Sequence, residues 1–215
     1  MKGKYVVVGG MPGINLEAYC GTIDGNFPSN YLVTTEGSGE MMSYLPGVGL
    51  EEYLEDVIAG KYSAFELLTL ISADMNMHLR VDVLPELHAG NNVRSLRGDV
   101  DMFLHLYGMG CTDLVSDAFD LRKKQIKAGL PSPHAYLIYN LDPQMVYDAV
   151  RADAKEGDSD TPSLEYFERM STGLKHFKAS VELDGTTKVY IIDANGSDED
   201  ICAETNEIMS EIIGQ

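Results

Sequence analysis

The sequence predicts an α/β fold in which one parallel β-sheet is covered by helices on both faces. Short apolar runs, typical of buried strands, alternate along the chain with longer segments of helical periodicity. The segments between the strands are long enough for the helical crossovers that parallel pairing requires. No internal repeat, low-complexity tract or linker divides the chain, so we expect a single three-layer domain over residues 1–215.

Five runs are the expected strands. KYVVVG is apolar almost throughout, as expected of a central strand that is buried on both faces. HAYLIYNLD and TKVYIIDANG are as clear, whereas NYLVTTE is weaker. NNVRSLRG is a strand by its position, but Arg94 has to find an acid or reach solvent there. In chain order, the expected strands lie at residues 4–9, 30–36, 91–98, 134–142 and 187–196.

The intervening segments have the apolar spacing of helices. The longest of them contains Pro85, which predicts a kink or a break near Leu84. Pro143 stands in the first turn of a later helix, where a proline is well tolerated. Ser197 is the expected N-cap of the last helix, and acidic residues follow it. The expected helices lie at residues 49–60, 63–88, 100–109, 113–129, 144–155, 163–177 and 197–213.

The charge of the chain is strongly unbalanced. The 16 basic and 34 acidic side chains give a formal net charge of −18. Such a surface repels nucleic acid and anionic membranes, so we expect neither as a partner. Three explanations stay open: ordinary solubility, a salt-adapted host, or a protein partner with a basic face.

The remaining composition predicts neither a membrane span nor a metal site. No apolar run approaches the ~20 residues that a membrane helix needs. Cys20, Cys111 and Cys202 are far apart and form no CxxC motif, which indicates free thiols in a cytoplasmic protein. His88 and His105 have no carboxylate or cysteine at ligand spacing, so we expect no metal.

The stretch GGMPGINLEAY, residues 9–19, is the first candidate site. It follows a predicted strand and leads into a helix, which is where a phosphate-binding P-loop lies. The P-loop pattern G-x-x-x-x-G-K-[ST], aligned on Gly10, ends in glycine, lysine and a hydroxyl residue. This chain has Asn15, Leu16 and Glu17 at those positions. The loop therefore lacks the lysine and carries a carboxylate near the place of a phosphate.

In open α/β sheets, ligands bind at the carboxyl ends of the strands. This rule places residues 9–17, Glu36, Arg97 and residues 193–197 around one crevice. The loop contributes Gly10, Pro12, Gly13, Asn15, Leu16 and Glu17 to it.

The chain resembles thymidylate kinase over nearly its whole length. Six segments carry the resemblance, in the family's order and at similar spacing. They match the opening strand and P-loop, the Arg-Glu-Pro-Gly-Gly segment, the long helix, the Asp-Arg-Tyr motif, the Asp-Pro turn with its helix and lid, and the last strand with its adenine-side loop. In this chain they read MKGKYVVVGGMPG, TTEGSGE (34–40), FELLTLISADMNMHLRVDVLPELHAG (65–90), SLRGDVD (95–101), PHAYLIYNLDPQMVYDAVRADAKEGD (133–158) and TTKVYIIDANGSDEDI (186–201).

The resemblance implies a P-loop nucleotide-kinase-like fold, with a possible lid at residues 151–163. It also implies a site that has lost much of its charge. Leu16 stands for the lysine that neutralises the β- and γ-phosphates, and Glu17 for the hydroxyl that binds Mg²⁺. Pro12 replaces the aspartate of the loop. Glu36 is retained, but Thr35 replaces the arginine before it.

The acceptor side is altered in the same way. Ile71 stands for the thymine-stacking phenylalanine, Met75 for the arginine that holds the acceptor phosphate, and Met77 for the residue that reads the base. Met75, Met77 and Met102 either fill the former acceptor pocket or pack in an ordinary core.

Few cationic positions survive. Of the Asp-Arg-Tyr motif only Arg97 remains, and the arginine-rich lid keeps at most Arg151 and Lys155. DANGS (193–197) stays close to the family form, although a strand-to-helix turn needs no nucleotide to explain it. The nucleotide-binding candidates are therefore Glu36, Arg97, Asp193, Ala194 and Asn195.

Two residues allow two interpretations each. Glu17 either folds back onto the amides of the helix N-terminus and replaces a phosphate, or is an ordinary first-turn glutamate in water. Arg97 either binds a ligand or forms an ion pair with Glu36 or Asp99.

We therefore expect a catalytically degenerate thymidylate kinase homologue that acts through protein contacts or residual nucleotide binding. Phosphoryl transfer is mainly positioning and charge neutralisation, and each lost charge-stabilising group costs on the order of 10²–10³ in rate. The resemblance implies a homodimer packed through helices, with residues 63–88 as a candidate face. One alternative is an active nucleoside monophosphate kinase that uses ATP and Mg²⁺, with charge from Arg97, Arg151 and Lys155. Another is an acidic interaction protein that uses its surface.

Overall fold

Five parallel strands form the sheet around which the chain is organised. In this computed structural model the described residues are 3–14, 16–26, 32–35, 61–153, 162–183 and 185–214. The strand order is β2-β3-β1-β4-β5, and every neighbouring pair is parallel. The strands are β1 (Tyr5–Gly10), β2 (Leu32–Thr35), β3 (Val93–Leu96), β4 (Ala135–Asn140) and β5 (Lys188–Asp193). The predicted α/β class with a helix-covered parallel sheet is confirmed.

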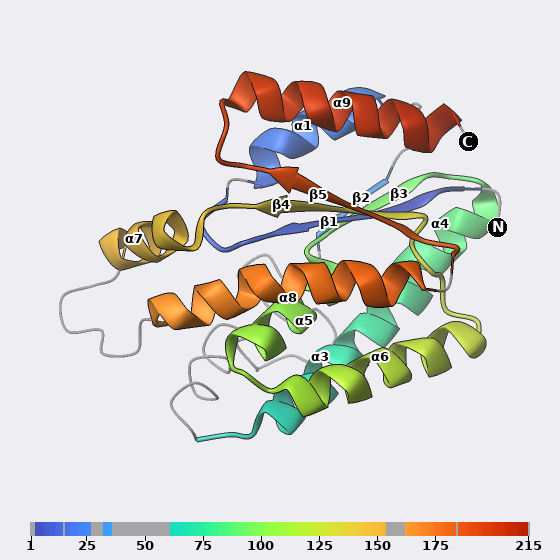
Figure 1. The fold of residues 1–215 in the computed structure, drawn as a ribbon. Coiled ribbons are helices and arrows are strands. Elements are labelled where there is room, and N and C mark those ends of the chain that lie inside the picture. Colours follow the sequence, from blue (N-terminus) through green and yellow to red (C-terminus); the bar gives the residue numbers. More distant parts are fainter. Residues whose placement is uncertain are drawn as a thin grey trace.

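Helices cover both faces of this sheet. Figure 1 shows α1 and α9 on one face, α3, α5, α6 and α8 on the other, and α7 beyond the carboxyl ends of the strands. The helical elements are α1 (Leu16–Asn26), α3 (Ala64–His78), the π-helix η1 (Leu79–Val83), α4 (Leu84–Ala89), α5 (Gly98–Gly108), α6 (Thr112–Lys127), α7 (Pro143–Asp153), α8 (Leu164–Glu182) and α9 (Asp198–Gly214). The helix predicted at 49–60 and most of the predicted lid lie outside the described residues.

The two faces of the sheet enclose two apolar cores, because successive strand side chains point to opposite faces. On β1, Tyr5 and Val7 pack under α5 and α8, whereas Val6 and Val8 pack under α1 and α9. Strands β4 and β5 follow the same alternation. β1 is therefore buried on both faces, as its continuous apolar sequence predicts.

The break predicted near Leu84 is present as a change of helix type. The chain passes from α3 into a π-helical turn, and the N–H of Leu84 bonds to the carbonyl of Leu79. Pro85 has no N–H and its ring crowds the carbonyl four residues back, which disfavours an ordinary α-turn there. The His78 and Asp82 side chains meet across this turn at 2.9 Å.

Arg94 occupies β3 without reaching solvent. Its side chain is buried on the face covered by α1, where Nη1 donates a hydrogen bond to Sγ of Cys20 at 2.8 Å. The strand predicted at residues 91–98 is therefore confirmed over Val93–Leu96 despite the arginine inside it.

Helices α5 and α8 pack closely because each presents a glycine to a tyrosine of the other. A Cβ on Gly108 would lie 2.6 Å from the Tyr166 ring, and a Cβ on Gly173 would lie 2.3 Å from the Tyr107 ring. No side chain larger than hydrogen fits at either position without movement of the opposing helix.

Replacing Gly173 by alanine is expected to lower the free energy of unfolding by about 1–3 kcal/mol, because the added methyl group overlaps the Tyr107 ring. Urea denaturation measures the change. Gly21→Ala is the matched control: it is also helical, but no atom lies within 4 Å of the added Cβ, so its stability should stay equal or rise. Equal stability of both variants would contradict the close packing.

Candidate functional site

The carboxyl ends of β1 and β3 define the candidate site. After β1 the chain turns into α1 on one face of the sheet, whereas after β3 it turns into α5 on the other. Adjacent strands whose connections diverge in this way form a topological switch point, where α/β sheets bind ligands. Gly9 and Arg97 lie together here, because a Cβ on Gly9 would lie 3.5 Å from the Arg97 carbonyl oxygen. The structure thus brings the predicted loop and Arg97 to one place.

The loop after β1 uses its backbone amides inside the protein. Met11 N–H donates to the Tyr139 carbonyl at 3.0 Å, and Leu16 N–H donates to the Ile14 carbonyl at 2.9 Å. Ile14 N–H in turn donates to the Met11 carbonyl at 3.4 Å, and Pro12 has no N–H. A phosphate-binding loop needs such amides to point at the ligand. Here the amides of Met11, Ile14 and Leu16 are bonded to carbonyl groups instead.

Gly13 places the loop next to helix α7. Its φ is +80°, which favours glycine, and a Cβ there would make an ordinary contact with Cβ of Ala149 at 3.6 Å. The outer side of the loop is thus in contact with α7 rather than open on all sides.

Leu16 belongs to the core. Its side chain is buried with Val6 and Val8 on the α1 face of the sheet, and a Cβ on Gly10 would lie 3.2 Å from its Cδ2. Close approach of the Tyr139 carbonyl, at 2.9 Å from the same Cβ position, also requires glycine at position 10. The position at which the thymidylate kinase resemblance places a lysine is therefore filled by packing.

Some predicted residues cannot be placed. Asn15, Glu36 and Lys155 lie outside the described residues, as does the side chain of Glu17. The hypothesis that Glu17 replaces a phosphate therefore stays a prediction.

Arg97 has an unusual backbone. Its φ of 68° and ψ of −73° make it the one non-glycine residue with positive φ in the described part of the chain. This conformation is rare and strained, and such strain is often found at functional sites. Its N–H donates to the Val8 carbonyl at 2.5 Å, and its side chain is half exposed at the β1–β3 end of the sheet.

The predicted ion pair between Arg97 and Asp99 is wrong. Arg97 Nη1 lies 3.3 Å from Oδ2 of Asp101, four residues on, because that residue shares the exposed side of the first turns of α5. Asp99 points into the protein instead and pairs with Arg122 at 2.6 Å.

Asp101, His105 and Tyr166 form a row of polar side chains with Arg97. None of these three was predicted from the sequence as a site residue. Asp101 lies against the carboxyl end of β1, with Oδ1 3.3 Å from a Cβ position on Gly9. His105 Nδ1 lies 2.5 Å from the hydroxyl of Tyr166 on α8. The four-residue spacing of Arg97, Asp101 and His105 was a signal for one helix face, whereas the contribution of Tyr166 depends on how α8 docks.

Burial sets the protonation of this row. Desolvation, with a smaller contribution from the Arg97 charge, lowers the pKa of His105 to about 4. Desolvation, with the nearby Asp101 carboxylate, raises the pKa of Tyr166 above its ordinary value. Both groups are therefore neutral near pH 7. The row holds one cation and one anion, Arg97 and Asp101, and has no spare positive charge.

The predicted adenine-side loop is tied to its neighbours. Asn195 Oδ1 accepts from the backbone N–H of Asp142 at 2.8 Å, and Asn195 N–H donates to Oδ1 of Asp193 at 3.0 Å. Ala194 is buried, and its N–H donates to the Asn140 carbonyl at 2.9 Å. These bonds join the turns that follow β4 and β5.

The other predicted residues do not converge on the crevice as a set. Ile71 and Met75 pack against the core, but Met77 is 46% exposed on the opposite side of α3. Met102 is buried, with its sulfur 3.8 Å from the Ser72 hydroxyl. Arg151 lies over the ring of Tyr147 on its own helix and donates to that hydroxyl at 3.0 Å.

Two searches of the described chain found nothing further. No group of three His, Cys, Asp or Glu side chains there is arranged to hold a metal ion. No helix there is long and apolar enough to cross a bilayer. Comparison with protein-family models and with curated proteins gave no match to this chain.

Acid is expected to destabilise the fold through His105. Its pKa of about 4 lies below the ~6.5 of an unfolded histidine, so the unfolded chain takes up the proton first. Stability is then full above about pH 6.5 and is lost as the pH falls towards 4. Thermal unfolding midpoints across this range measure the loss.

His105→Gln should flatten this pH dependence. A small part of it should remain because of His134, whose pKa is also lowered by burial. The exposed His88→Gln serves as the control and should keep the wild-type slope. A wild-type slope in His105→Gln would show that this histidine does not titrate as inferred.

Proposed function

We propose that this protein is a non-catalytic relative of the nucleoside monophosphate kinases, similar to thymidylate kinase, that acts by binding rather than by phosphoryl transfer. The observation that carries the proposal is the closed loop after β1. The amides of Met11, Ile14 and Leu16 bond to protein carbonyls, and Leu16 lies in the core at the expected lysine position. A triphosphate would lack these three donors and the cation that it needs.

The charge of the crevice supports the same conclusion. Arg97 is the basic side chain at the β1–β3 junction of the described structure, and Asp101 already offsets it. Each missing charge-stabilising group costs on the order of 10²–10³ in transfer rate. One offset arginine is too little to stabilise a transferring phosphoryl group.

What the site retains suits a single phosphate group. The Arg97 guanidinium is half exposed and is held by a strained backbone at the switch point. An incoming phosphate can exchange with Asp101 as the partner of this guanidinium, in a charge-assisted hydrogen bond. We therefore propose a nucleoside monophosphate such as dTMP as the ligand, with no requirement for ATP or Mg²⁺.

Thermal melting and a turnover assay on one sample test this function. We expect dTMP to raise the midpoint of unfolding, because ligand at 100 times its Kd adds about 2.7 kcal/mol of stability. ATP–Mg²⁺ alone should cause no shift, and the two together should form no ADP.

Arg97→Ala should abolish the dTMP shift, whereas Arg151→Ala should keep it, because Arg151 contacts Tyr147 on its own helix. ADP formation that Arg97→Ala abolishes would support the active-kinase alternative instead, which the strained Arg97 favours. No shift with either nucleotide would favour the acidic-surface alternative, for which α9 carries six acidic residues and no basic one.

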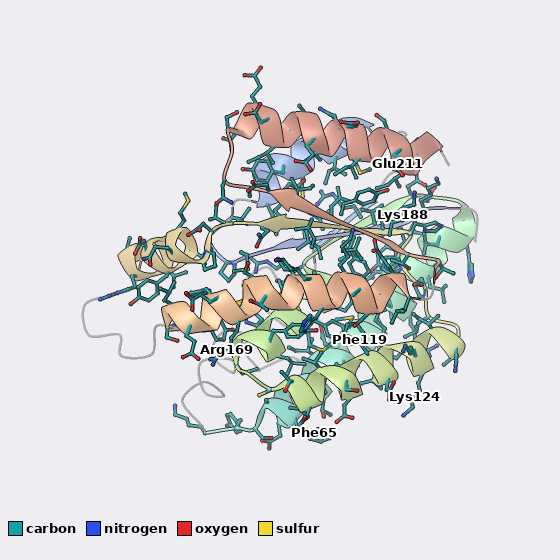
Figure 2. The ribbon with its side chains drawn as sticks, in the orientation of Figure 1. Phe65, Phe119, Lys124, Arg169, Lys188 and Glu211 are labelled. Carbon is teal, nitrogen blue, oxygen red and sulfur yellow. The ribbon has the colours of Figure 1, made fainter. Side chains whose placement is uncertain are left out.

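We also propose that α3 and α6 form the interface of a homodimer. Phe65, Met77 and Val81 of this helical layer are between 46% and 59% exposed. Figure 2 shows Phe65 and Lys124 on the side of the layer that faces away from the sheet. Exposed large apolar side chains are the feature of this layer on which the proposed protein contact is based.

The charges of α6 identify a second copy as the partner. The exposed acids Asp113, Asp117 and Asp120 lie towards its N-terminal end, and the exposed Lys123, Lys124 and Lys127 towards its C-terminal end. No ion pair joins these six side chains to other described residues. Two antiparallel copies related by a twofold axis place the acidic half of one α6 against the basic half of the other.

The dimer is tested by light scattering after size exclusion. Phe65→Asp should shift the protein to monomer, because it places a carboxylate in the apolar part of the interface. Leu183→Asp is the control, since Leu183 is an exposed apolar residue at the end of α8. A monomeric wild type at micromolar concentration, or equal masses for both variants, would contradict the interface.

A further inference from the structure

A buried ion pair and a tyrosine bonded to it connect α5, α6 and β4, two residues along the chain from Arg97. Arg122 Nε on α6 lies 2.6 Å from Oδ2 of Asp99 on α5, and the Tyr136 hydroxyl on β4 donates to the same oxygen at 2.8 Å. All three side chains are buried. We call Asp99, Arg122 and Tyr136 the buried triad.

Stability alone does not explain the buried triad. Removing two charges from water is costly, and apolar side chains of similar size often replace a buried ion pair without loss of stability. Burial works against the charge of Arg122, but the Asp99 carboxylate, Tyr136 and Tyr5 together outweigh it and raise the pKa of Arg122 above its ordinary value. The best attested use of such a pair is to select one register among several packing arrangements.

The register that the buried triad selects is that of the first turn of α5. Asp99 is the second residue of this helix, and it follows the strained Arg97 and Gly98, whose φ is 59°. A strained backbone persists only where its surroundings hold it from both sides. On the strand side the holding contact is Arg97 N–H to the Val8 carbonyl. On the helix side it is the anchored Asp99.

We propose that Asp99, Arg122 and Tyr136 are positioning residues that hold Arg97 in its strained conformation at the crevice. Without the anchor, α5 can shift along or rotate about its axis, and Arg97 relaxes to an ordinary conformation. The guanidinium then leaves the rim of the crevice. The effect on ligand binding rests on the proposed function, whereas the effect on the backbone does not.

The test replaces the buried triad by apolar side chains: Asp99→Leu, Arg122→Met and Tyr136→Phe together. We expect the unfolding midpoint to stay equal or rise. Hydrogen exchange of the Arg97 amide should accelerate by about tenfold or more, because its bond to Val8 opens more readily. Exchange of the Met11 amide, bonded to Tyr139 on the other side of β1, should be unchanged. The affinity for dTMP should fall by at least about tenfold.

The outcomes separate the two proposals. If the wild type does not bind dTMP but the exchange change occurs, the proposed ligand is wrong and the positioning role is right. If Arg97 exchange is unchanged in a stable triple variant, the positioning role is wrong.

Two further variants keep the test informative. Tyr136→Phe alone keeps the ion pair and removes one hydrogen bond. This variant therefore tests the positioning role even if the triple variant does not fold. Its Arg97 amide should exchange faster while its Met11 amide does not. Lys188→Met with Glu211→Leu removes the exposed 2.7 Å pair between β5 and α9, shown in Figure 2, and should leave Arg97 exchange at the wild-type rate.

Discussion

Burial of β1 on both faces is the constraint on which the rest of the structure depends. β1 lies between β3 and β4, so its alternate side chains enter two separate cores. Both cores need helical cover, and the chain supplies it by leaving β1 through α1 on one face and β3 through α5 on the other. The candidate site lies where these two departures diverge. Its position is therefore a consequence of how the sheet is covered.

The same constraint limits what the first loop can do. The residue that enters α1 directly after the loop must help to cover the sheet, and Leu16 does so against Gly10 and Val8. A lysine would have to leave this core to reach a ligand. The amides of Met11, Ile14 and Leu16 bond to carbonyls of the loop and of β4, which stabilises the turn but makes these three donors unavailable to an anion. In this chain the loop contributes to packing rather than to the binding of a triphosphate.

The distribution of charge also argues against the binding of a triphosphate. The net charge of the chain is −18, and α9 alone carries six acidic residues and no basic one, whereas two arginines of the described structure each pair with one acid. Arg122 is paired with Asp99 in the interior, and Arg97 with Asp101 at the rim. Such one-to-one pairing stabilises particular positions of helices. It leaves no excess of positive potential with which to attract a highly charged ligand.

The sequence by itself determined the α/β class, the order of the elements and the break at Pro85, because apolar periodicity, glycine and proline act over a few residues. It also placed the loop and Arg97 at the same end of the sheet, since the carboxyl ends of parallel strands meet there. Only the tertiary structure decided that Arg97 pairs with Asp101, that Asp99 turns inward to Arg122, and that Tyr166 meets His105. These contacts depend on the rotation of α5 and its docking against α8, which long-range packing at Gly108 and Gly173 sets and no local pattern encodes.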